Sequence, residues 1–454
     1  MNTAGHAYDF EKDGIYYNIT SLQNLTVEVT SGDNRYIGDF VIPEEVFYSE
    51  RLFMVTKIGD KAFSHSDVTK IIIPNSITTI GVYAFEYCSA LHELSIPSSV
   101  SNIGSGCFTG CRGLNNLRIE DGDKGLSLGY KEYQVNNYST FLDCPLVYVY
   151  IGRNCTGSSG DYHATFYNQR NLKTIEIGGN VTYIGGFANC YGLEEIDIPG
   201  NVNSISSNAF NGCKNLQNTI IHEGVQHIGS SAFNGCTSIN TITFPSTIIG
   251  IGNGSFAGCT SINNIYSKII EPFDISQTAF AGITYLNSTL YVPTGTKNLY
   301  QERRGWKDFV SIVETDDFED IPVIPEKPKC ASPTISYVNW NIKFECETEG
   351  AQIVSEVKPT DLKNTTEVEV SLTPTYIITA YAIAEGYQKS DMVTATISWR
   401  KGRPVIIQGF SNVNLEESTA NCDVNGDCTV DVADIATIIS NMAAHTRKNE
   451  VMEE

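Results

Sequence analysis

Basic residues are scarce in this chain. Its 454 residues include 30 Lys and Arg against 52 Asp and Glu, so the formal net charge is −22 and the pI is near 4.7. Binding to nucleic acid depends on clustered Lys and Arg that neutralise phosphates, and we therefore expect no nucleic-acid partner. No run of the sequence approaches the roughly 20 apolar residues that a membrane-spanning helix needs, so we expect no membrane span.

Signatures of catalysis are missing as well. The chain has 7 histidines, none in an H-E-x-x-H pattern, and it contains neither a G-x-S-x-G elbow nor a G-x-x-x-x-G-K-[ST] loop. Carboxylate pairs such as Glu194 and Glu195 fall on repeat surfaces, whereas glycoside hydrolysis needs two carboxylates that face each other in a cleft. The sequence therefore favours a protein that is not an enzyme.

What the chain does contain is a phenylalanine that recurs about every 23 residues. The unit reads I-G-x-x-A-F-x-x-C-x-x-L-x-x-I-x-I-P, and its period lies in the range of leucine-rich repeats, about 20–29 residues. A single unit cannot bury its apolar face, whereas stacked units share one continuous core. The sequence therefore predicts an α/β leucine-rich-repeat solenoid with its phenylalanines buried above one another. They are Phe63, Phe85, Phe108, Phe141, Phe166, Phe187, Phe210, Phe233, Phe256 and Phe280.

The L-x-x-I-x-I part of each unit, for example Leu91–Ile96, alternates like a short strand with one buried face. Proline follows in several units, at Pro74, Pro97, Pro199 and Pro245, and ends the strand because it cannot donate to the next rung. The residues between the buried positions should face outward in rows. These residues are Glu93, Ser95, Asn116, Arg118, Tyr148, Tyr150, Thr174, Glu176, Glu195, Asp197, Thr241 and Thr243.

We predict that a protein or glycan partner binds to this outward face. Tyrosine provides a large contact area at a small entropic cost, and insertions in solenoids often lie on the binding face. Two over-length units supply further tyrosines beside the central pair. The predicted contact residues are Tyr148, Tyr150, Arg118, Glu176, Asp197, Tyr130 and Tyr133. The alternative is that the over-length loops have no role in binding.

Cysteine is concentrated in the repeat, where most units carry one three residues after the phenylalanine. Free cysteine packs as a small hydrophobe, parallel side chains have poor geometry for disulfides, and no C-x2-C pair indicates zinc. We therefore expect buried, reduced thiols at Cys88, Cys111, Cys144, Cys190, Cys213, Cys236 and Cys259. Outside the repeat, Cys330 could pair with Cys346, and Cys422 with Cys428, in an oxidising compartment.

Caps are expected at both ends of the solenoid, because a bare end would expose its core. Residues 1–57 are predicted to form a cap of β-hairpins, with an Asp13-Gly14 turn between two alternating segments. Residues 58–313 are predicted to form the solenoid together with its C-terminal cap. In that cap, Tyr300, Trp306 and Phe309 should lie on the last coil.

Beyond the solenoid the composition changes. Residues 314–329 form an acidic, proline-containing linker, and residues 330–400 alternate with period two, which predicts a small all-β sandwich of immunoglobulin-like type. A second linker, 401–420, leads to a short loop-helix tail at 421–454.

The tail contains a pattern typical of a calcium loop, D-V-N-G-D-C-T-V-D-V-A-D. Oxygen ligands fall at the spacing that surrounds one Ca²⁺ ion. They belong to Asp423, Asn425, Asp427, Thr429 through its carbonyl, Asp431 and Asp434. Two departures from the usual loop are an aspartate at the last position and Cys428 where glycine is common. The alternative is an acidic, solvated turn.

On these residues, three resemblances can be stated. The repeat unit and its C-terminal cap, over Tyr8 to Val313, resemble the BspA-type leucine-rich-repeat family, surface proteins of anaerobic gut and mouth bacteria. Cys330 to Arg400 resembles the immunoglobulin-like domain at the C-terminus of chitobiases. Cys422 to Met442 resembles one of the two repeats of a type I dockerin.

The resemblance implies export, adhesion, and binding of host or matrix proteins, with a cohesin-like or cell-surface anchor at the tail. The alternative is a non-catalytic component of a polysaccharide-degrading or carbohydrate-binding assembly. Met1–His6 shows neither the basic stretch nor the apolar core of a signal peptide, which is typical of a cytosolic protein or of one whose leader lies outside this numbering. With the resemblance, we expect an extracellular or cell-surface location.

Overall fold

The structure is a computed structural model that describes residues 8–130, 140–157, 165–318, 329–338, 341–349, 351–359, 375–383, 390, 393–400, 403–408 and 412–414. The chain divides into two units, Met1–Asp320 and Ile321–Glu454, and each is described by itself.

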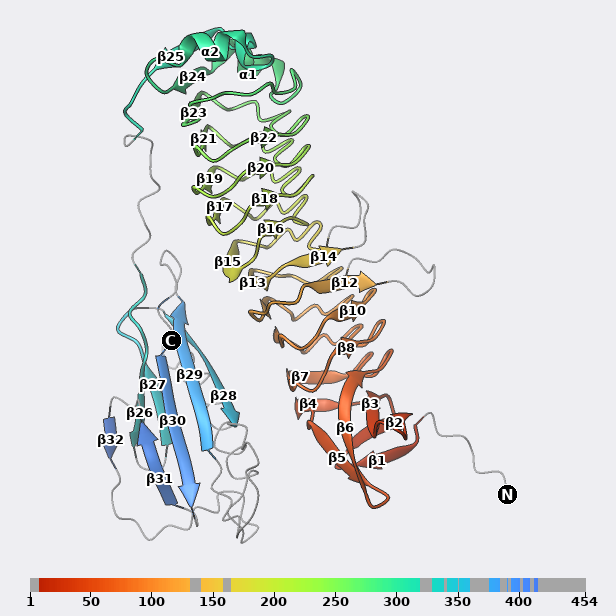
Figure 1. Ribbon diagram of the computed structural model, residues 1–454. Coiled ribbons are helices and arrows are strands. Elements are labelled where there is room, and N and C mark those ends of the chain that lie inside the picture. Colours follow the sequence, from red (N-terminus) through yellow and green to blue (C-terminus); the bar gives the residue numbers. More distant parts are fainter. Residues whose placement is uncertain are drawn as a thin grey trace, which may run out of the picture. The chain divides into compact units, whose positions relative to one another are not determined.

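The first unit starts with β-hairpins. β1 (Phe10–Lys12) pairs antiparallel with β2 (Ile15–Ser21), and β2 with β3 (Thr26–Thr30). The predicted turn between β1 and β2 is present, because Asp13 and Gly14 take the left-handed φ values of 53° and 78° that such a turn requires. β3 then pairs in parallel with β6 (Arg51–Ile58), which also pairs with β5 (Glu45–Tyr48). The hairpins therefore join the hydrogen-bond ladder of the solenoid at its N-terminal end (Figure 1).

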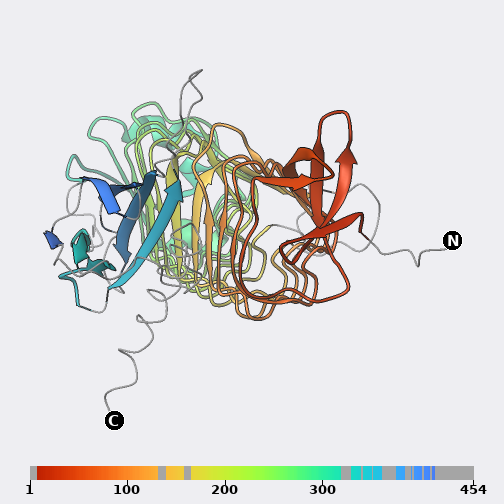
Figure 2. The ribbon, with the colours of Figure 1, turned by 90° about the horizontal axis from the view of Figure 1, so that it is seen from below.

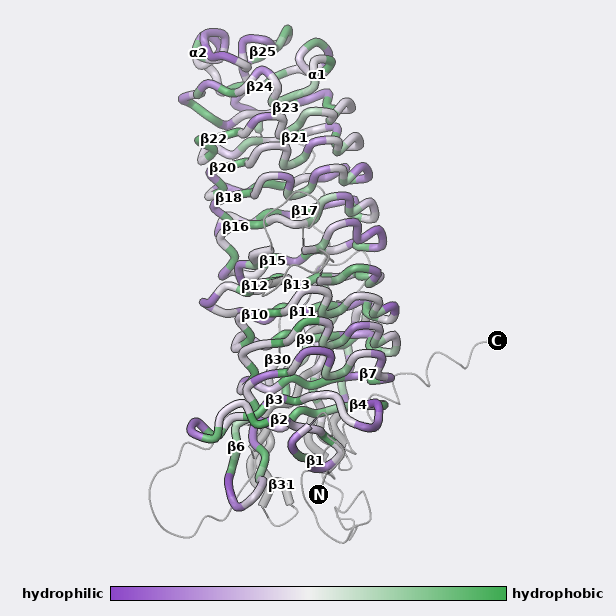
Figure 3. Tube along the Cα trace, turned by 90° about the vertical axis from the view of Figure 1, so that its right-hand side faces the viewer, coloured by the Kyte–Doolittle hydropathy of each residue, from purple (hydrophilic) through white to green (hydrophobic). Residues whose placement is uncertain are grey.

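The L-x-x-I-x-I segments lie parallel to one another along one side of the solenoid, which we call the strand face (Figures 1 and 3). β4 (Ile37–Val41) pairs with its first strand. The ladder of this face is hydrogen-bonded within three further groups, β9 to β15, β17 with β19, and β21 to β25. Its strands are β7 (Asp67–Ile72), β9 (Glu93–Ile96), β11 (Asn116–Ile119), β13 (Tyr148–Arg153), β15 (Thr174–Asn180), β17 (Glu195–Ile198), β19 (Asn218–Ile221), β21 (Thr241–Phe244), β23 (Asn264–Ser267), β24 (Thr289–Val292) and β25 (Ser311–Glu314).

A second ladder, made of strands that precede the phenylalanine of each coil, continues from β6. It pairs in parallel from β6 to β14 and again from β16 to β22. Seen nearly end-on, successive coils follow a common outline (Figure 2). The strands are β8 (Thr79–Ile80), β10 (Asn102–Gly104), β12 (Leu126–Tyr130), β14 (Cys155–Gly157), β16 (Tyr183–Ile184), β18 (Ser204–Ile205), β20 (His227–Ile228) and β22 (Gly250–Ile251).

The predicted α/β class implies a helix in each repeat, and the structure corrects this: the segment around the phenylalanine is not helical. Its amides donate to the next coil, as Phe210 N does to the Ala232 carbonyl at 2.7 Å, whereas a helix needs bonds within one segment. Left-handed residues also flank the phenylalanine, for example Tyr83 (φ 55°) and Tyr87 (φ 58°) around Phe85, and a right-handed helix excludes them. The repeat is therefore predominantly β, and the helices described in this unit lie in its C-terminal cap.

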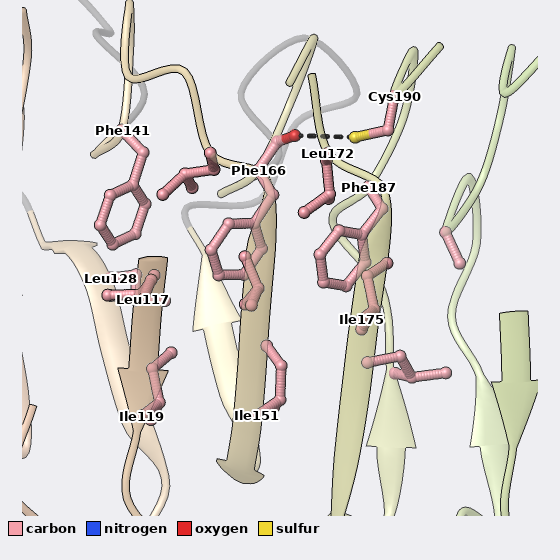
Figure 4. Packing of buried hydrophobic residues seen from close by; sticks show 14 of the residues in the cluster. Leu117, Ile119, Leu128, Phe141, Ile151, Phe166, Leu172, Ile175, Phe187 and Cys190 are labelled. Atoms are coloured by element: carbon pink, nitrogen blue, oxygen red, sulfur yellow. Dashed lines mark hydrogen bonds between the residues drawn. The ribbon is translucent and has the colours of Figure 1, made fainter. Parts of the chain in front are cut away.

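The phenylalanines form the centre of the core, as predicted. All ten are at most 2% exposed, and the ring centroids of successive coils lie 4.8–5.9 Å apart in stacked orientation. Figure 4 shows Phe141, Phe166 and Phe187 side by side in a row on successive coils. The continuous core therefore depends on each coil covering the ring of its neighbour.

The cysteine positions form a second column beside the rings. All seven thiols are buried and free, as expected, and each Sγ donates to the phenylalanine carbonyl of the preceding coil at 3.0–3.2 Å. Figure 4 draws this bond from Cys190 to Phe166. The coil of Phe166 has glutamine at the cysteine position, and Gln169 Nε2 donates to the Phe141 carbonyl at 2.8 Å. In these eight coils the position therefore carries a hydrogen-bond donor.

The C-terminal cap closes the last coil. It contains α1 (Gly282–Asn287), α2 (Lys297–Glu302) and the short 3-10 helix η1 (Trp306–Asp308), which alternate with β24 and β25. Tyr300, Trp306 and Phe309 are buried, as predicted. The rings of Trp306 and Phe309 contact that of Phe280, with centroids 6.3 Å and 5.3 Å away.

The second unit contains two sheets in its described residues. β26 (Thr334–Val338) lies between β27 (Asn341–Glu345) and β32 (Asn412–Asn414). The other sheet has the order β28-β29-β30-β31, antiparallel throughout. Its strands are β28 (Gln352–Pro359), β29 (Thr375–Ile383), β30 (Val393–Arg400) and β31 (Arg403–Gln408). The immunoglobulin-like type of this unit stays a prediction.

Cys346 is a free thiol in the structure and its Sγ donates to the Ala331 carbonyl at 3.1 Å, so the pairing considered for Cys330 and Cys346 is not formed there. Cys422 and Cys428, together with the predicted calcium ligands between Asp423 and Asp434, lie outside the described residues.

Candidate functional site

The strand face brings the predicted outward residues into two rows. Strand register aligns Glu93, Asn116, Tyr148 and Thr174 in one row. It aligns Ser95, Arg118, Tyr150 and Glu176 in the other. Leu94, Leu117, Val149 and Ile175 alternate with these residues and are buried, so the outward row follows from the burial of its neighbours.

Arg118, Tyr150 and Asp121 form a compact cluster on this face. The Arg118 guanidinium carbon lies 4.0 Å from the centroid of the Tyr150 ring, the geometry of a cation–π contact. The Tyr150 hydroxyl donates to the Asp121 carboxylate, 2.8 and 2.9 Å from its two oxygens. A guanidinium nitrogen of Arg118 lies 3.8 Å from the same carboxylate. Three side chains from two strands and the following turn thus fix one another.

Tyr148 extends this cluster toward the next coil. Its hydroxyl donates a short hydrogen bond to the carboxylate of Glu176 on β15. Burial and the hydrogen bond to Asp121 raise the pKa of Tyr150, so the phenol stays protonated and acts as a donor. Tyr150 is only 7% exposed, so its ring is largely covered although it lies in an outward row, and Tyr148 is the more exposed of the two tyrosines.

The other predicted residues lie apart from this cluster. Asp197 is on β17, which is not hydrogen-bonded to β15, and its carboxylate accepts from His222 Nε2 at 2.7 Å. Tyr130 ends β12 and so belongs to the second ladder, away from the outward rows. Tyr133 lies outside the described residues. The structure thus brings together Tyr148, Tyr150, Arg118 and Glu176.

Two supporting residues were not predicted from the sequence. The buried Arg153 donates to the carbonyls of Pro97 and Ser98 at 2.7 and 2.6 Å, bridging to a coil more than 50 residues earlier. Glu120 accepts from Ser95 Oγ at 3.2 Å and from Ser98 N at 3.3 Å. Both connect the turn of β9 to the coils that carry the cluster.

A signal for this support is present in the sequence. Glu120, Gly152 and Gly178 occupy the position at which several other units have proline. A Cβ on Gly178 would lie 2.7 Å from the Tyr150 hydroxyl oxygen and 2.8 Å from Asp121 Oδ1. The absence of a side chain there leaves room for the bond between Tyr150 and Asp121. Three successive units without this proline therefore indicate, in the sequence, where the cluster lies.

The strand face changes character above β17. The outward positions of β19, β21, β23, β24 and β25 carry no charged residue, whereas five of those on β9 to β17 are charged. The charged ones are Glu93, Arg118, Glu176, Glu195 and Asp197. We call β9 to β17 the charged zone and β19 to β25 the neutral zone. In the neutral zone the rings of Tyr266 and Tyr291 stack, with centroids 4.6 Å apart.

Among the described residues, no group of His, Cys, Asp and Glu is arranged to hold a metal ion. Searched over the same residues, no helix has the length and apolar character needed to cross a membrane.

Comparison with known proteins agrees with this architecture. The model of the BspA type leucine-rich-repeat region matches in 6 copies, over residues 56–155, 127–217 and 158–287. These segments together span half of the chain, and the protein belongs to this family of repeat proteins. No curated protein matches.

Several solved structures are similar. A leucine-rich repeat protein from Bacteroides ovatus is 24% identical, with a TM-score of 0.43 over 69% of this chain and 80% of that chain. A leucine-rich cell surface protein from Faecalibacterium prausnitzii is 20% identical, with a TM-score of 0.36 over 69% and 96%. A leucine-rich repeat protein from T. pallidum is 18% identical, with a TM-score of 0.29 over 50% and 87%.

Proposed function

We propose that this protein is a non-catalytic binding protein of the cell exterior, which recognises a protein partner through the charged zone of its strand face. The observation that carries the proposal is the pair Tyr148 and Arg118, half-buried side chains held in place by Glu176, by Asp121 and by the buried ring of Tyr150. Tyrosine and arginine are enriched among the residues that dominate binding energy. Preorganisation lowers the entropic cost of association, because these side chains are already ordered.

Charge defines the kind of protein partner. The outward positions of the zone carry four acidic residues against one arginine, and Asp121 adds another carboxylate beside them. Complementary charge raises the association rate and suppresses partners of the same sign. The zone is therefore suited to a protein surface that presents Lys or Arg around an aromatic or apolar centre.

Binding to a panel of immobilised matrix proteins, such as fibronectin, laminin and collagen, tests this proposal. The variant Tyr148→Ala/Tyr150→Ala should weaken binding at least tenfold, and the matched variant Tyr266→Ala/Tyr291→Ala should not. Because the zone is charged, affinity should fall between 50 and 500 mM NaCl. Equal affinity of the two variants for every ligand of the panel would place the recognition surface elsewhere.

The tail supplies a second proposed role, attachment through a calcium-loaded loop. Asp423, Asn425 and Asp427 open the ligand series, and the apolar residues that follow, Ile435 to Met442, would dock when the ion neutralises the carboxylates. Titration of the full chain with Ca²⁺ should show one site in the ~10⁻⁴–10⁻³ M range typical of extracellular modules. The variant Asp423→Ala/Asp427→Ala should abolish it. Absence of heat at millimolar Ca²⁺ in the unaltered chain would leave the tail as an acidic tether.

A further inference from the structure

The neutral zone is a separate surface with its own chemistry. Its last three strands, β23, β24 and β25, are in parallel register and present two outward rows. One row contains Asn264, Thr289 and Ser311, and the other contains Tyr266, Tyr291 and Val313. All six are half-buried or exposed, with Val313 42% exposed. Short polar side chains thus run beside a row of aromatic and aliphatic ones.

The tyrosine pair makes this surface stiff. The two rings are nearly parallel, with an interplanar angle of 12°, and each belongs to the strand next to the other. Side chains that restrain each other in this way lose little rotamer freedom when a ligand binds. Leu290 and Ile312, which alternate with the outward residues, are buried and hold β24 and β25 on the core.

The periodicity of the surface limits what can bind to it. Adjacent strands in a sheet lie about 4.8 Å apart, so hydroxyl or amide groups recur at that interval along the solenoid axis. An extended polymer of similar, repeating units can make the same kind of contact on successive coils, and such contacts add through effective concentration. A globular protein surface has no such regular repeat.

The outward positions carry no charge, and this narrows the class of polymer. Glu314, the charged residue of β25, accepts from the backbone amides of Gly295 and Lys297 in the cap. A polyanion or polycation would lose hydration on this surface without meeting a compensating charge. We infer that the neutral zone binds an uncharged polysaccharide chain along the solenoid axis. The sugar hydroxyls exchange hydrogen bonds with the Asn264, Thr289 and Ser311 row, and the apolar faces of the sugar rings pack on Tyr266, Tyr291 and Val313. This inference is independent of the protein partner proposed for the charged zone.

Affinity electrophoresis of the full chain tests it, in native gels containing barley β-glucan, xyloglucan or galactomannan, with polygalacturonate as the charged comparator. At least one neutral polymer should retard the protein, and polygalacturonate should not. Tyr266→Ala/Tyr291→Ala should reduce the retardation at least tenfold in apparent affinity. Tyr148→Ala/Tyr150→Ala should leave it unchanged, which separates this outcome from that of the protein-binding test.

A variant that only removes the hydroxyls, Tyr266→Phe/Tyr291→Phe, keeps the stacked pair and controls for folding. It should retain measurable retardation, and its melting temperature should match that of the unaltered chain. No retardation by any of the three neutral polymers would overturn the inference. Equal retardation by polygalacturonate, or retardation that survives Tyr266→Ala/Tyr291→Ala, would overturn it as well.

Discussion

The charged zone and the neutral zone of the strand face are built on the same backbone and differ in what supports their side chains. In the neutral zone β21 and β23 belong to regular coils and β24 to the C-terminal cap, and the outward residues follow from the alternation of each strand. In the charged zone, Arg118 and Tyr150 are oriented by Asp121, and Glu120 and Arg153 tie the turns together. Outward residues of the repeat can thus be replaced without changing the coil. Charged residues beside aromatic rings, in contrast, are accompanied here by changes in the repeat unit itself.

The largest expected effect concerns the hydrophobic core, which should be continuous beneath both zones. Replacing a buried phenylalanine by alanine tests this. Phe166 lies under the charged zone and Phe233 near the neutral zone, and both are at most 1% exposed. Replacing either by alanine should lower the free energy of unfolding by about 3–5 kcal/mol. Urea denaturation measures this, with the exposed Ile249→Ala as a control that should change it by less than about 0.5 kcal/mol. A much smaller cost at one of the two phenylalanines would show that the core is not continuous.

Removal of Arg153 should affect the charged zone alone. Arg153→Met removes a donor from the Ser98 carbonyl and leaves the Pro97 carbonyl with the bond from Val100 N at 3.1 Å, and an unsatisfied buried group costs about 1–3 kcal/mol. Stability and the affinity of the protein partner should therefore fall, while retardation by neutral polysaccharide stays unchanged. Arg112→Ala, at an exposed position, is the control. Loss of both binding activities together would mean that the zones are energetically coupled.

Two adjacent glycines give a matched pair for the packing of Tyr150. Gly178→Ala should displace the Tyr150 hydroxyl from Asp121 and cost about 1–3 kcal/mol, as overpacking does. A Cβ on Gly179 meets no atom within 4 Å, so Gly179→Ala should have little effect. Thermal unfolding and partner binding would be measured for both. Similar results for the two variants would contradict the role assigned to Gly178.

The smallest expected effect is a pH dependence of the free energy of unfolding, which arises from the buried cysteines beneath both zones. Burial raises the pKa of Cys259 from 9.0 to about 12, so between these values the thiol ionises in the unfolded chain but not in the folded one. The unfolded state then binds fewer protons, and the free energy of unfolding should fall as pH rises through that interval. Cys259→Ser should flatten this decline slightly. Iodoacetamide should label Cys346, which is partly exposed, well before Cys259.

Much of this architecture could be predicted from the sequence, because the buried positions of the repeat unit recur from coil to coil. The spacing of Phe233 and its equivalents placed the rings in one column, and the alternation of L-x-x-I-x-I placed Tyr148 outward. The same alternation could not show that Tyr150, in the other outward row, is only 7% exposed. The cluster partners could not be predicted, because Tyr150 reaches Asp121 across 29 residues and Arg153 reaches Pro97 across 56. The α/β class was assigned with the leucine-rich-repeat period, which could not reveal that the amides around Phe210 donate to the next coil.

The hydrogen bonds between coils also have a mechanical meaning. Amides of the two ladders and of the phenylalanine segment, together with the cysteine thiols, all connect one coil to the next and therefore lie roughly along the solenoid axis. Under tension between its ends, the solenoid should yield first at a cap, which is bonded to the stack on one side only, and then coil by coil. Each coil of about 23 residues would then release roughly 80 Å of extended chain. A protein displayed at a cell surface could in this way lengthen stepwise under shear while its remaining coils keep hold of their ligands.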